Sequence, residues 1–225
     1  MAKKNVSVED QNLENVQEAL NTTTMWIEKN QKKLLIAVSA IVVLIVAVLG
    51  YNQYVVKPNQ ENINNENALA TVYFMQGNYE VALNGDSANC VGFKEIADEY
   101  TMYQGGKLAA LYTGICYFQM GQYEDAVEYL KKFDAKDVNV APAALQLLGD
   151  TYVRLEDYNN AVKAFEGAAK SGNKVIAPMS LRKLGFVYIE LGDKAAAKKA
   201  FETIKNEYPA SAEASDIDKY ISIAE

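Results

Sequence analysis

The sequence predicts an all-α protein in which one membrane-spanning helix precedes a stack of antiparallel helix pairs closed by a capping helix. Three observations carry this prediction. An uncharged apolar run covers Leu34–Gly50, and a pattern of Gly, Tyr, Ala and Leu or Phe recurs three times after it. The 225 residues also contain only 4 prolines and 13 glycines, too few for a low-complexity chain.

Residues 1–33 form a polar segment before the apolar run. Within it Leu13, Val16 and Leu20 recur at helical spacing, which predicts a short amphipathic helix that Thr22–Thr24 interrupt. Two interpretations remain open for this segment. It is either a solvated tail that frays or a helix that docks on a partner.

Residues 34–56 are predicted to span a membrane as an uncleaved signal anchor. The 17 residues of Leu34–Gly50 extend about 25 Å as a helix, and the 23 residues to Val56 extend about 34 Å, against a hydrocarbon core of about 30 Å. Tyr51 and Tyr54 then fall at the membrane interface. A buried core helix is the alternative, whereas 33 preceding residues and the missing small-x-small cleavage site disfavour a cleaved signal peptide.

The lysines around the span predict its orientation. Lys29, Lys32 and Lys33 precede it, and Lys57 is the only cation for a long stretch after it. By the positive-inside rule the N-terminus lies in the cytoplasm and residues 57–225 lie outside. The net charge of −8 on residues 58–225 agrees with this orientation.

The repeated pattern begins at Gly114, Gly149 and Gly185, which are 35 and 36 residues apart. Each glycine is followed by a tyrosine after three residues, an alanine after twelve and a leucine or phenylalanine after sixteen. These residues are Tyr117, Tyr152 and Tyr188; Ala126, Ala161 and Ala197; and Leu130, Phe165 and Phe201. Small residues let two antiparallel helices approach closely, and the large side chains fill the space between units.

These positions, with Gly121, Glu156 and Gly192 in the turns and Pro209 at the end, resemble the tetratricopeptide repeat. The resemblance implies an α-solenoid over residues 57–225, with units at about 61–104, 107–140, 142–175 and 178–209 and a capping helix at 211–224. The first unit is degenerate, because the insertion Asn84–Gly92 splits its second helix. This insertion is either a tolerated surface loop or a partner contact.

A short cytoplasmic segment, one signal anchor and an outer repeat domain of this size are together similar to the YfgM-like family of bacterial envelope proteins. The GICYFQMGQYEDAVEYLKKFD unit resembles versions found in Bacteroidota. The resemblance implies a single-pass inner-membrane protein with its repeat domain in the periplasm. It also implies three kinds of partner: the SecYEG translocon, periplasmic chaperones and exported client proteins.

Residue composition disfavours catalysis and nucleic-acid binding. The chain has no histidine, which excludes Ser-His-Asp and Cys-His catalysis and imidazole metal ligands, and its net charge is −7. Gly105-Gly106-Lys107 lacks the other residues of a phosphate loop and is expected in a turn between helices. Five carboxylates lack the spacing of a calcium loop and are expected on a solvated face: Glu124, Asp125, Glu128, Asp134 and Asp137. We therefore expect no catalytic residue, metal, cofactor or small-molecule substrate.

The two cysteines are expected in different environments. Cys116 lies between Gly114 and Tyr117 on a small-residue face and is expected to be buried. Cys90 lies in the insertion and is expected to be exposed to an oxidising compartment. A Cys90–Cys116 disulfide stays open as an alternative, and neither thiol has a neighbouring base that would make it a nucleophile.

The tetratricopeptide resemblance also implies a partner-binding groove lined by the first helix of each unit. The implied residues are Leu111, Ile115, Phe118 and Gln119; Gln146, Asp150, Val153 and Arg154; and Arg182, Phe186, Ile189 and Glu190. The Lys and Asn pattern that grips a C-terminal carboxylate in some members is missing. A wall that is apolar at both ends and charged in the middle suits a protein surface or an extended peptide. In an alternative interpretation, some of these twelve side chains pack against neighbouring first helices or against the capping helix.

Two functions are compatible with these features. In the first, the outer domain binds clients or partners beside the translocon as a chaperone or adaptor. In the second, the protein is a structural scaffold for another envelope complex, without client contact. A client binder would crosslink to many nascent proteins, and a scaffold to a few fixed ones. An enzyme is disfavoured because no nucleophile–base pair, metal cluster or cofactor loop is found.

Overall fold

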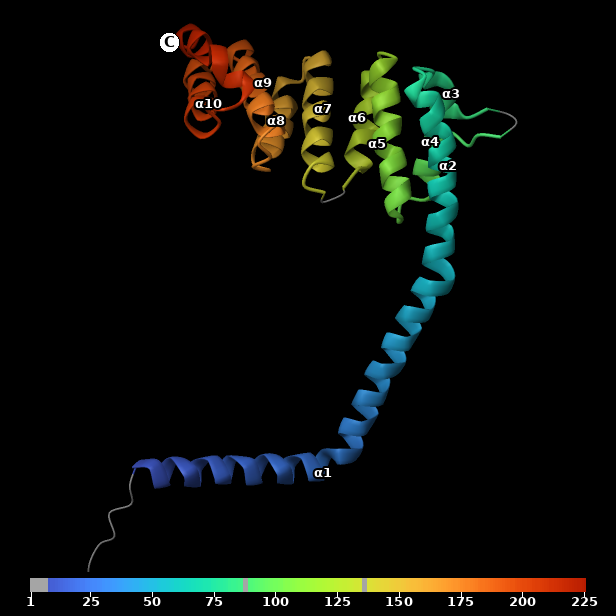
Figure 1. Ribbon diagram of the computed structural model, residues 1–225, viewed down its shortest axis with the longest axis vertical. Helices are drawn as coiled ribbons and strands as arrows, with labels where there is room; N and C mark the ends of the chain where they lie inside the picture. The colour runs from blue at the N-terminus through green and yellow to red at the C-terminus, as the bar shows by residue number, and fades with distance from the viewer. Residues whose placement is uncertain (1–7, 87–88, 135–136) are drawn as a thin grey trace, which may run out of the picture. The chain divides into compact units, whose positions relative to one another are not determined.

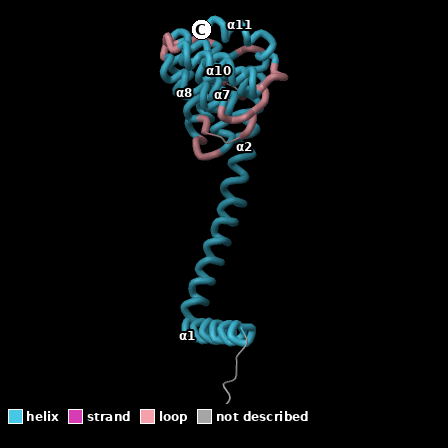
Figure 2. The backbone as a smooth tube through the Cα atoms, turned by 90° about the vertical axis from the view of Figure 1, so that its left-hand side faces the viewer, coloured by secondary structure: helices cyan, strands magenta, loops and turns pink. Residues whose placement is uncertain are grey.

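The computed structural model describes residues 8–86, 89–134 and 137–225, with side chains from Thr24 onward. Within these ranges the chain is helical and contains no β-strand, although one isolated antiparallel bridge joins Gly85 and Val91 (Figure 2). The predicted all-α fold is therefore confirmed. The chain divides between Pro58 and Asn59 into two units, which are described separately.

From Val8 onward the first unit is one continuous helical segment. Helix α1 (Val8–Tyr51) runs directly into the π-helical turn η1 (Asn52–Val56). Its apolar part has a mean hydropathy of 2.9 over 18 residues and none of it is buried within the structure, so it is long and apolar enough to cross a membrane. The side chains of Leu13, Val16 and Leu20 lie outside the described residues.

Helix α1 continues through Thr22–Thr24, where the sequence predicts an interruption. The prediction was wrong because threonine lowers helix propensity by less than about 1 kcal/mol and keeps its backbone N–H. Three such residues weaken a helix without removing any of its hydrogen bonds.

The second unit is a stack of helix pairs (Figure 1). Helix α2 (Lys57–Met75) precedes α3 (Tyr79–Asn84) and α4 (Phe93–Glu99), which the insertion separates. The next three pairs are α5 (Gln104–Gln119) with α6 (Tyr123–Lys132), α7 (Val140–Arg154) with α8 (Tyr158–Ala169), and α9 (Ile176–Glu190) with α10 (Lys194–Glu207). The stack ends in a 3₁₀ turn η2 (Ala212–Asp216) and the short helix α11 (Ile217–Ile223).

The repeat glycines lie where the two helices of a pair touch. A Cβ atom on Gly149 would lie 2.5 Å from Cε1 of Phe165, and one on Gly114 would lie 2.6 Å from Cγ of Leu130. Gly185 faces Phe201 in the same way. The alanines of the pattern, Ala126, Ala161 and Ala197, are fully buried. Close helix approach is therefore the physical reason for the small residues.

The turn within each pair repeats one hydrogen bond. The backbone N–H of Asp193 donates to the carbonyl of Tyr188 at 2.8 Å, and that of Asp157 donates to Tyr152 at 2.9 Å. Such a turn needs one residue of positive φ, which is a glycine at 77, 121 and 192. In the α7–α8 pair Glu156 takes this position with φ 58°, a conformation that costs a non-glycine residue about 1–2 kcal/mol.

Gly105 and Gly106 lie inside the first turn of α5, which corrects the prediction that they form a turn between helices. A Cβ atom on Gly106 would collide with the carbonyl of Tyr100, and one on Gly105 with the side chain of Ile63. Glycine is needed here because α5 passes directly against α2 and the preceding loop.

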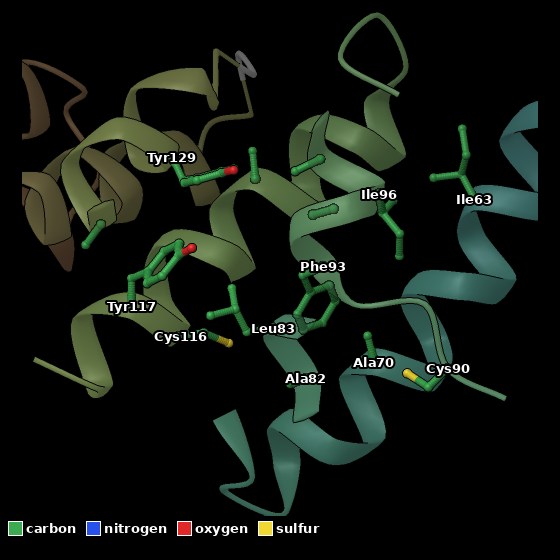
Figure 3. Packing of buried hydrophobic residues seen from close by; sticks show 14 residues of the cluster. Ile63, Ala70, Ala82, Leu83, Cys90, Phe93, Ile96, Cys116, Tyr117 and Tyr129 are labelled. Carbon is green, nitrogen blue, oxygen red and sulfur yellow. The ribbon is translucent and has the colours of Figure 1, made fainter. Parts of the chain in front are cut away.

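The described residues form three apolar core clusters along the stack. The first gathers side chains from α2 to α6, including Ile63, Phe93 and Ile96 (Figure 3). The last surrounds Phe165 and Phe201 and reaches the end of the chain. A small cluster of Leu111, Leu130 and Ala144 lies between them. Each unit therefore buries its apolar side chains against its neighbours.

Both cysteines are free and buried. The expected exposure of Cys90 was wrong, because its loop folds back on the core. One carboxylate oxygen of Asp86 accepts the backbone N–H groups of Asn89 at 2.6 Å and Cys90 at 3.0 Å. Burial raises the pKa of the Cys90 thiol and raises that of Cys116 to about 12.

Candidate partner-binding surface

The implied groove residues all lie on the first helices α5, α7 and α9, where they form four rows at matching positions. The rows are Leu111, Gln146 and Arg182; Ile115, Asp150 and Phe186; Phe118, Val153 and Ile189; and Gln119, Arg154 and Glu190. The structure places these rows at different depths, so they differ in what they offer to a partner.

The first row lies inside the stack. Leu111 and Gln146 are both 7% exposed, which differs from the expectation that they face a ligand. Leu111 packs with Leu130 and Ala144 between consecutive units. Arg182 pairs with Asp216 of η2, and its guanidinium carbon lies 4.8 Å from the ring centroid of Tyr220. Because of these internal contacts, the side chains of the first row offer little surface to a binding partner.

The second row contains an internal ion pair. Nζ of Lys183 on α9 donates to both carboxylate oxygens of Asp150 on α7, at 2.7 and 2.5 Å. Both side chains are about one third exposed, so the pair adds at most about 1 kcal/mol to stability, yet it neutralises the charge of Asp150. Phe186 is 39% exposed, and its ring centroid lies 5.0 Å from that of Tyr220.

The fourth row is the most accessible. Its residues Gln119, Arg154 and Glu190 are exposed at the carboxyl ends of their helices. In the third row, by contrast, Phe118 is half-buried against Tyr123 at 5.6 Å between ring centroids, and Val153 and Ile189 pack on the last core cluster. The surface open to a partner is thus the fourth row together with Phe186.

Sequence reasoning missed the residues that cover the implied groove. Lys183 stands 33 residues after Asp150, three fewer than the 36 between Gly149 and Gly185, so the repeat spacing does not predict this pair. Asp216 and Tyr220 belong to the capping segment, and nothing in the repeat pattern predicts their contacts with Arg182 and Phe186.

The carboxylates near the α6–α7 connection have structural partners. Asp134 pairs with Lys107 at 2.5 Å. Asp137 caps α7 by accepting the backbone N–H groups of Val140 at 2.7 Å and Asn139 at 2.8 Å, and these bonds lower the pKa of its carboxyl. Among the described residues no group of three or more Cys, Asp or Glu is placed to hold a metal ion.

Two surface pockets lie elsewhere on the second unit. One of 360 Å³ is lined by residues of the α8–α9 loop and the end of α10, including Lys174 and Tyr208. Another of 210 Å³ lies between α6 and α7 and is lined by Phe133 and Leu148 among others. Neither pocket includes an implied groove residue.

Two family models match the second unit. One described as anaphase-promoting complex, cyclosome, subunit 3 matches residues 95–174, and a tetratricopeptide repeat model matches residues 179–211. No curated protein matches the sequence.

Solved structures of low sequence identity are similar to this chain. One crystal structure of MamA is 21% identical, covering 69% of this chain and 91% of that chain with a TM-score of 0.51. A Podosopora anserina putative kinesin light chain with nearly identical TPR-like repeats is 14% identical, covering 73% and 86% with a TM-score of 0.55. At these identities the similarity concerns the fold alone.

Proposed function

We propose, from the premise that this chain is a tetratricopeptide-repeat protein, that residues 34–56 anchor it in a membrane and that residues 59–225 bind other proteins. One observation carries the proposal: Gln119, Arg154 and Glu190 repeat at one exposed position on three successive first helices, beside the half-open Phe186. A row of this kind matches an extended surface on another protein.

The charges on the row suggest how a partner is recognised. Asp150 and Arg182 are paired inside the domain, so Arg154 and Glu190 are the charged residues left for a partner. A partner surface with an acidic group, a basic group and an apolar side chain for Phe186 would complement them.

We further propose that the domain lies in the periplasm and that its partners are the SecYEG translocon, periplasmic chaperones or exported clients. The lysines before the span and the resemblance to YfgM-like proteins support this finer assignment. A structural scaffold for another envelope complex is the alternative.

Charge reversal on the exposed row tests partner binding. Full-length protein carrying Arg154→Glu and Glu190→Lys is extracted in mild detergent after crosslinking, and co-purifying proteins are quantified. Losing two contacts of about 1 kcal/mol each lowers recovery of direct partners about ten-fold or more. The matched control reverses Lys131 and Lys163, which are exposed on the second helices α6 and α8.

The identities of the recovered proteins separate the finer alternatives. Translocon subunits with many exported proteins support the adaptor assignment, whereas a few fixed proteins support the scaffold. Equal recovery by the test and control variants would refute binding through the exposed row. The row is a better test than Phe118 and Phe186, because truncating those packed rings also weakens the fold.

A further inference from the structure

Three loops on one edge of the second unit expose large apolar side chains. These loops precede α5, α7 and α9, and at their tips Met102 is 89% exposed, Val138 74% and Val175 66%. Because helices alternate in direction along the stack, these loops lie on the edge where α2 begins (Figure 1). We call this edge, defined by residues 100–103, 137–140 and 170–175, the anchor-side edge.

The first of these loops is bonded to the start of the unit. Nδ2 of Asn59 donates to the hydroxyl of Tyr103 at 2.9 Å. Asn59 is the third residue after Val56, where the proposed span ends, which is less than one helical turn along the chain. The loop that carries Met102 is therefore bonded to Asn59, the first residue of the second unit.

Polar contacts connect the loops in series. Lys107 at the start of α5 pairs with Asp134 after α6 at 2.5 Å. Nδ2 of Asn173 in the α8–α9 loop donates to Oδ1 of Asn139 at 3.1 Å. The edge is thus a continuous surface from α2 to α9, rather than three independent loops.

Helix caps fix the direction of the exposed valines. Asp137 accepts backbone N–H groups at the start of α7, and Oδ1 of Asn173 accepts those of Val175 and Ile176 at 3.0 Å each. These bonds set the loop backbone, so Val138 and Val175 stay on the outside of the core. A single exposed valine is ordinary, but the same feature in three successive loops on one edge is not.

The charged groups of this edge suit a lipid headgroup layer. The acidic charges of Asp134 and Asp137 are compensated by Lys107 and by the N-terminus of α7. In the third loop Lys174 is exposed, and Lys170 pairs with Glu166 at 3.5 Å. The exposed carboxylate of Glu207 lines the same surface pocket as Lys174. On the opposite edge the tight turns carry Glu156, Asp157 and Asp193, and its exposed Met75 and Leu191 come from helix ends.

We propose that the anchor-side edge contacts the surface of the membrane that the span crosses. Met102, Val138 and Val175 enter the boundary between headgroups and acyl chains, and Lys174 faces anionic headgroups. This inference rests on the proposed membrane anchor and not on partner binding. Such a contact would hold the repeat domain against the bilayer and leave the fourth row open to partners.

Spin labels on the full chain in nanodiscs containing anionic lipid test this contact. One label replaces Thr101 (Thr101→Cys), next to Met102, and the control label replaces Gln122 (Gln122→Cys), exposed in the α5–α6 turn of the opposite edge. The chain without either substitution is the background control, because it shows how much label the two buried native cysteines take up. For each label we measure its accessibility to oxygen divided by its accessibility to a water-soluble nickel complex. We expect this ratio to be several-fold higher at position 101 than at position 122.

Charge substitutions then test whether the apolar tips make the contact. The triple variant Met102→Glu, Val138→Glu and Val175→Glu should lower the ratio at position 101 to the value at 122. The matched control Met75→Glu and Leu191→Glu, on the opposite edge, should leave it unchanged. An unaltered ratio in the triple variant would overturn the proposal.

The remaining outcomes separate this inference from the anchor. A chain that resists alkaline carbonate extraction but shows equal ratios at 101 and 122 keeps its anchor and refutes the membrane contact. A label at 101 that is shielded from both oxygen and nickel indicates a protein on this edge and also refutes it. A chain released by carbonate refutes the anchor, and this inference with it.

Discussion

Replacing Gly149 by alanine sets two effects of opposite sign against each other. Alanine is favoured over glycine inside a helix by about 1 kcal/mol. The added Cβ atom, however, would lie 2.5, 2.6 and 2.8 Å from three atoms of the Phe165 ring, which is 1% exposed within the core. Overpacking of this kind costs about 1–3 kcal/mol, so we expect a net destabilisation of up to about 2 kcal/mol.

Gly167→Ala in α8 of the same unit is the matched control. There the new Cβ atom would lie 3.2 Å from Cδ1 of Leu145, the end of a flexible side chain that can shift by a few tenths of an ångström. The helix propensity then dominates, and we expect a stabilisation of about 0.5–1 kcal/mol. The two glycine-to-alanine changes are therefore expected to have opposite signs.

Thermal unfolding of the full chain in detergent micelles, followed by circular dichroism at the helix band, measures both variants. At about 2–4 °C per kcal/mol for a domain of this size, Gly149→Ala should lower Tm by up to about 4–8 °C and Gly167→Ala should raise it by about 1–4 °C. A Tm for Gly149→Ala equal to or above that of Gly167→Ala would refute close helix approach as the reason for the repeat glycine.

Four further predictions concern the fold, its titration and its topology. Glu156→Gly should raise Tm slightly, because glycine removes the strain of positive φ, whereas Lys199→Gly inside α10 should lower it; a loss of stability at Glu156 would contradict the strain. The pKa of the Asp137 carboxyl is lowered in the folded state. The ionised carboxylate therefore stabilises the fold at pH values above its pKa in the unfolded chain, and this stabilisation is lost as the pH falls through its pKa in the folded chain. Asp137→Asn should accordingly lose less stability than the parent chain between pH 5 and pH 2 in acid titrations followed by circular dichroism. Cys90 and Cys116 should react with a thiol reagent at neutral pH only after denaturation, since both are buried and their pKa values are raised; rapid modification of two thiols in the native protein would contradict this. A reporter active only outside the cytoplasm, fused after Glu225, should be active, and a stable but silent fusion would reverse the predicted orientation.

The regular features of this protein could be predicted because they depend on contacts within one helix pair. Gly149 and Phe165 are sixteen residues apart, so their close approach repeats in every unit and is visible as a period in the sequence. The same holds for the tight turns at Gly121, Glu156 and Gly192. The apolar run Leu34–Gly50 is equally local, since composition and length alone make a helix capable of spanning a membrane.

The site could be predicted only in part. The repeat offsets correctly place the twelve implied residues on the first helices, but they do not say which of them stay accessible. Leu111 and Gln146 are buried because consecutive units close over them, and Arg182 and Phe186 are partly covered by Asp216 and Tyr220. Accessibility depends on how neighbouring units and the capping segment pack.

The sequence by itself therefore determined the helices, their pairing and the candidate span, because each depends on residues close together in the chain. The tertiary structure alone decided the burial of Cys90, the pairing of Asp150 with Lys183 and the position of the loops before α5, α7 and α9 on one edge (Figure 1). In each of these cases the residues that meet, or the edge they share, come from different units or from a loop folded back on the core. Their proximity follows from the stacking of the units, and no periodicity within one helix encodes it.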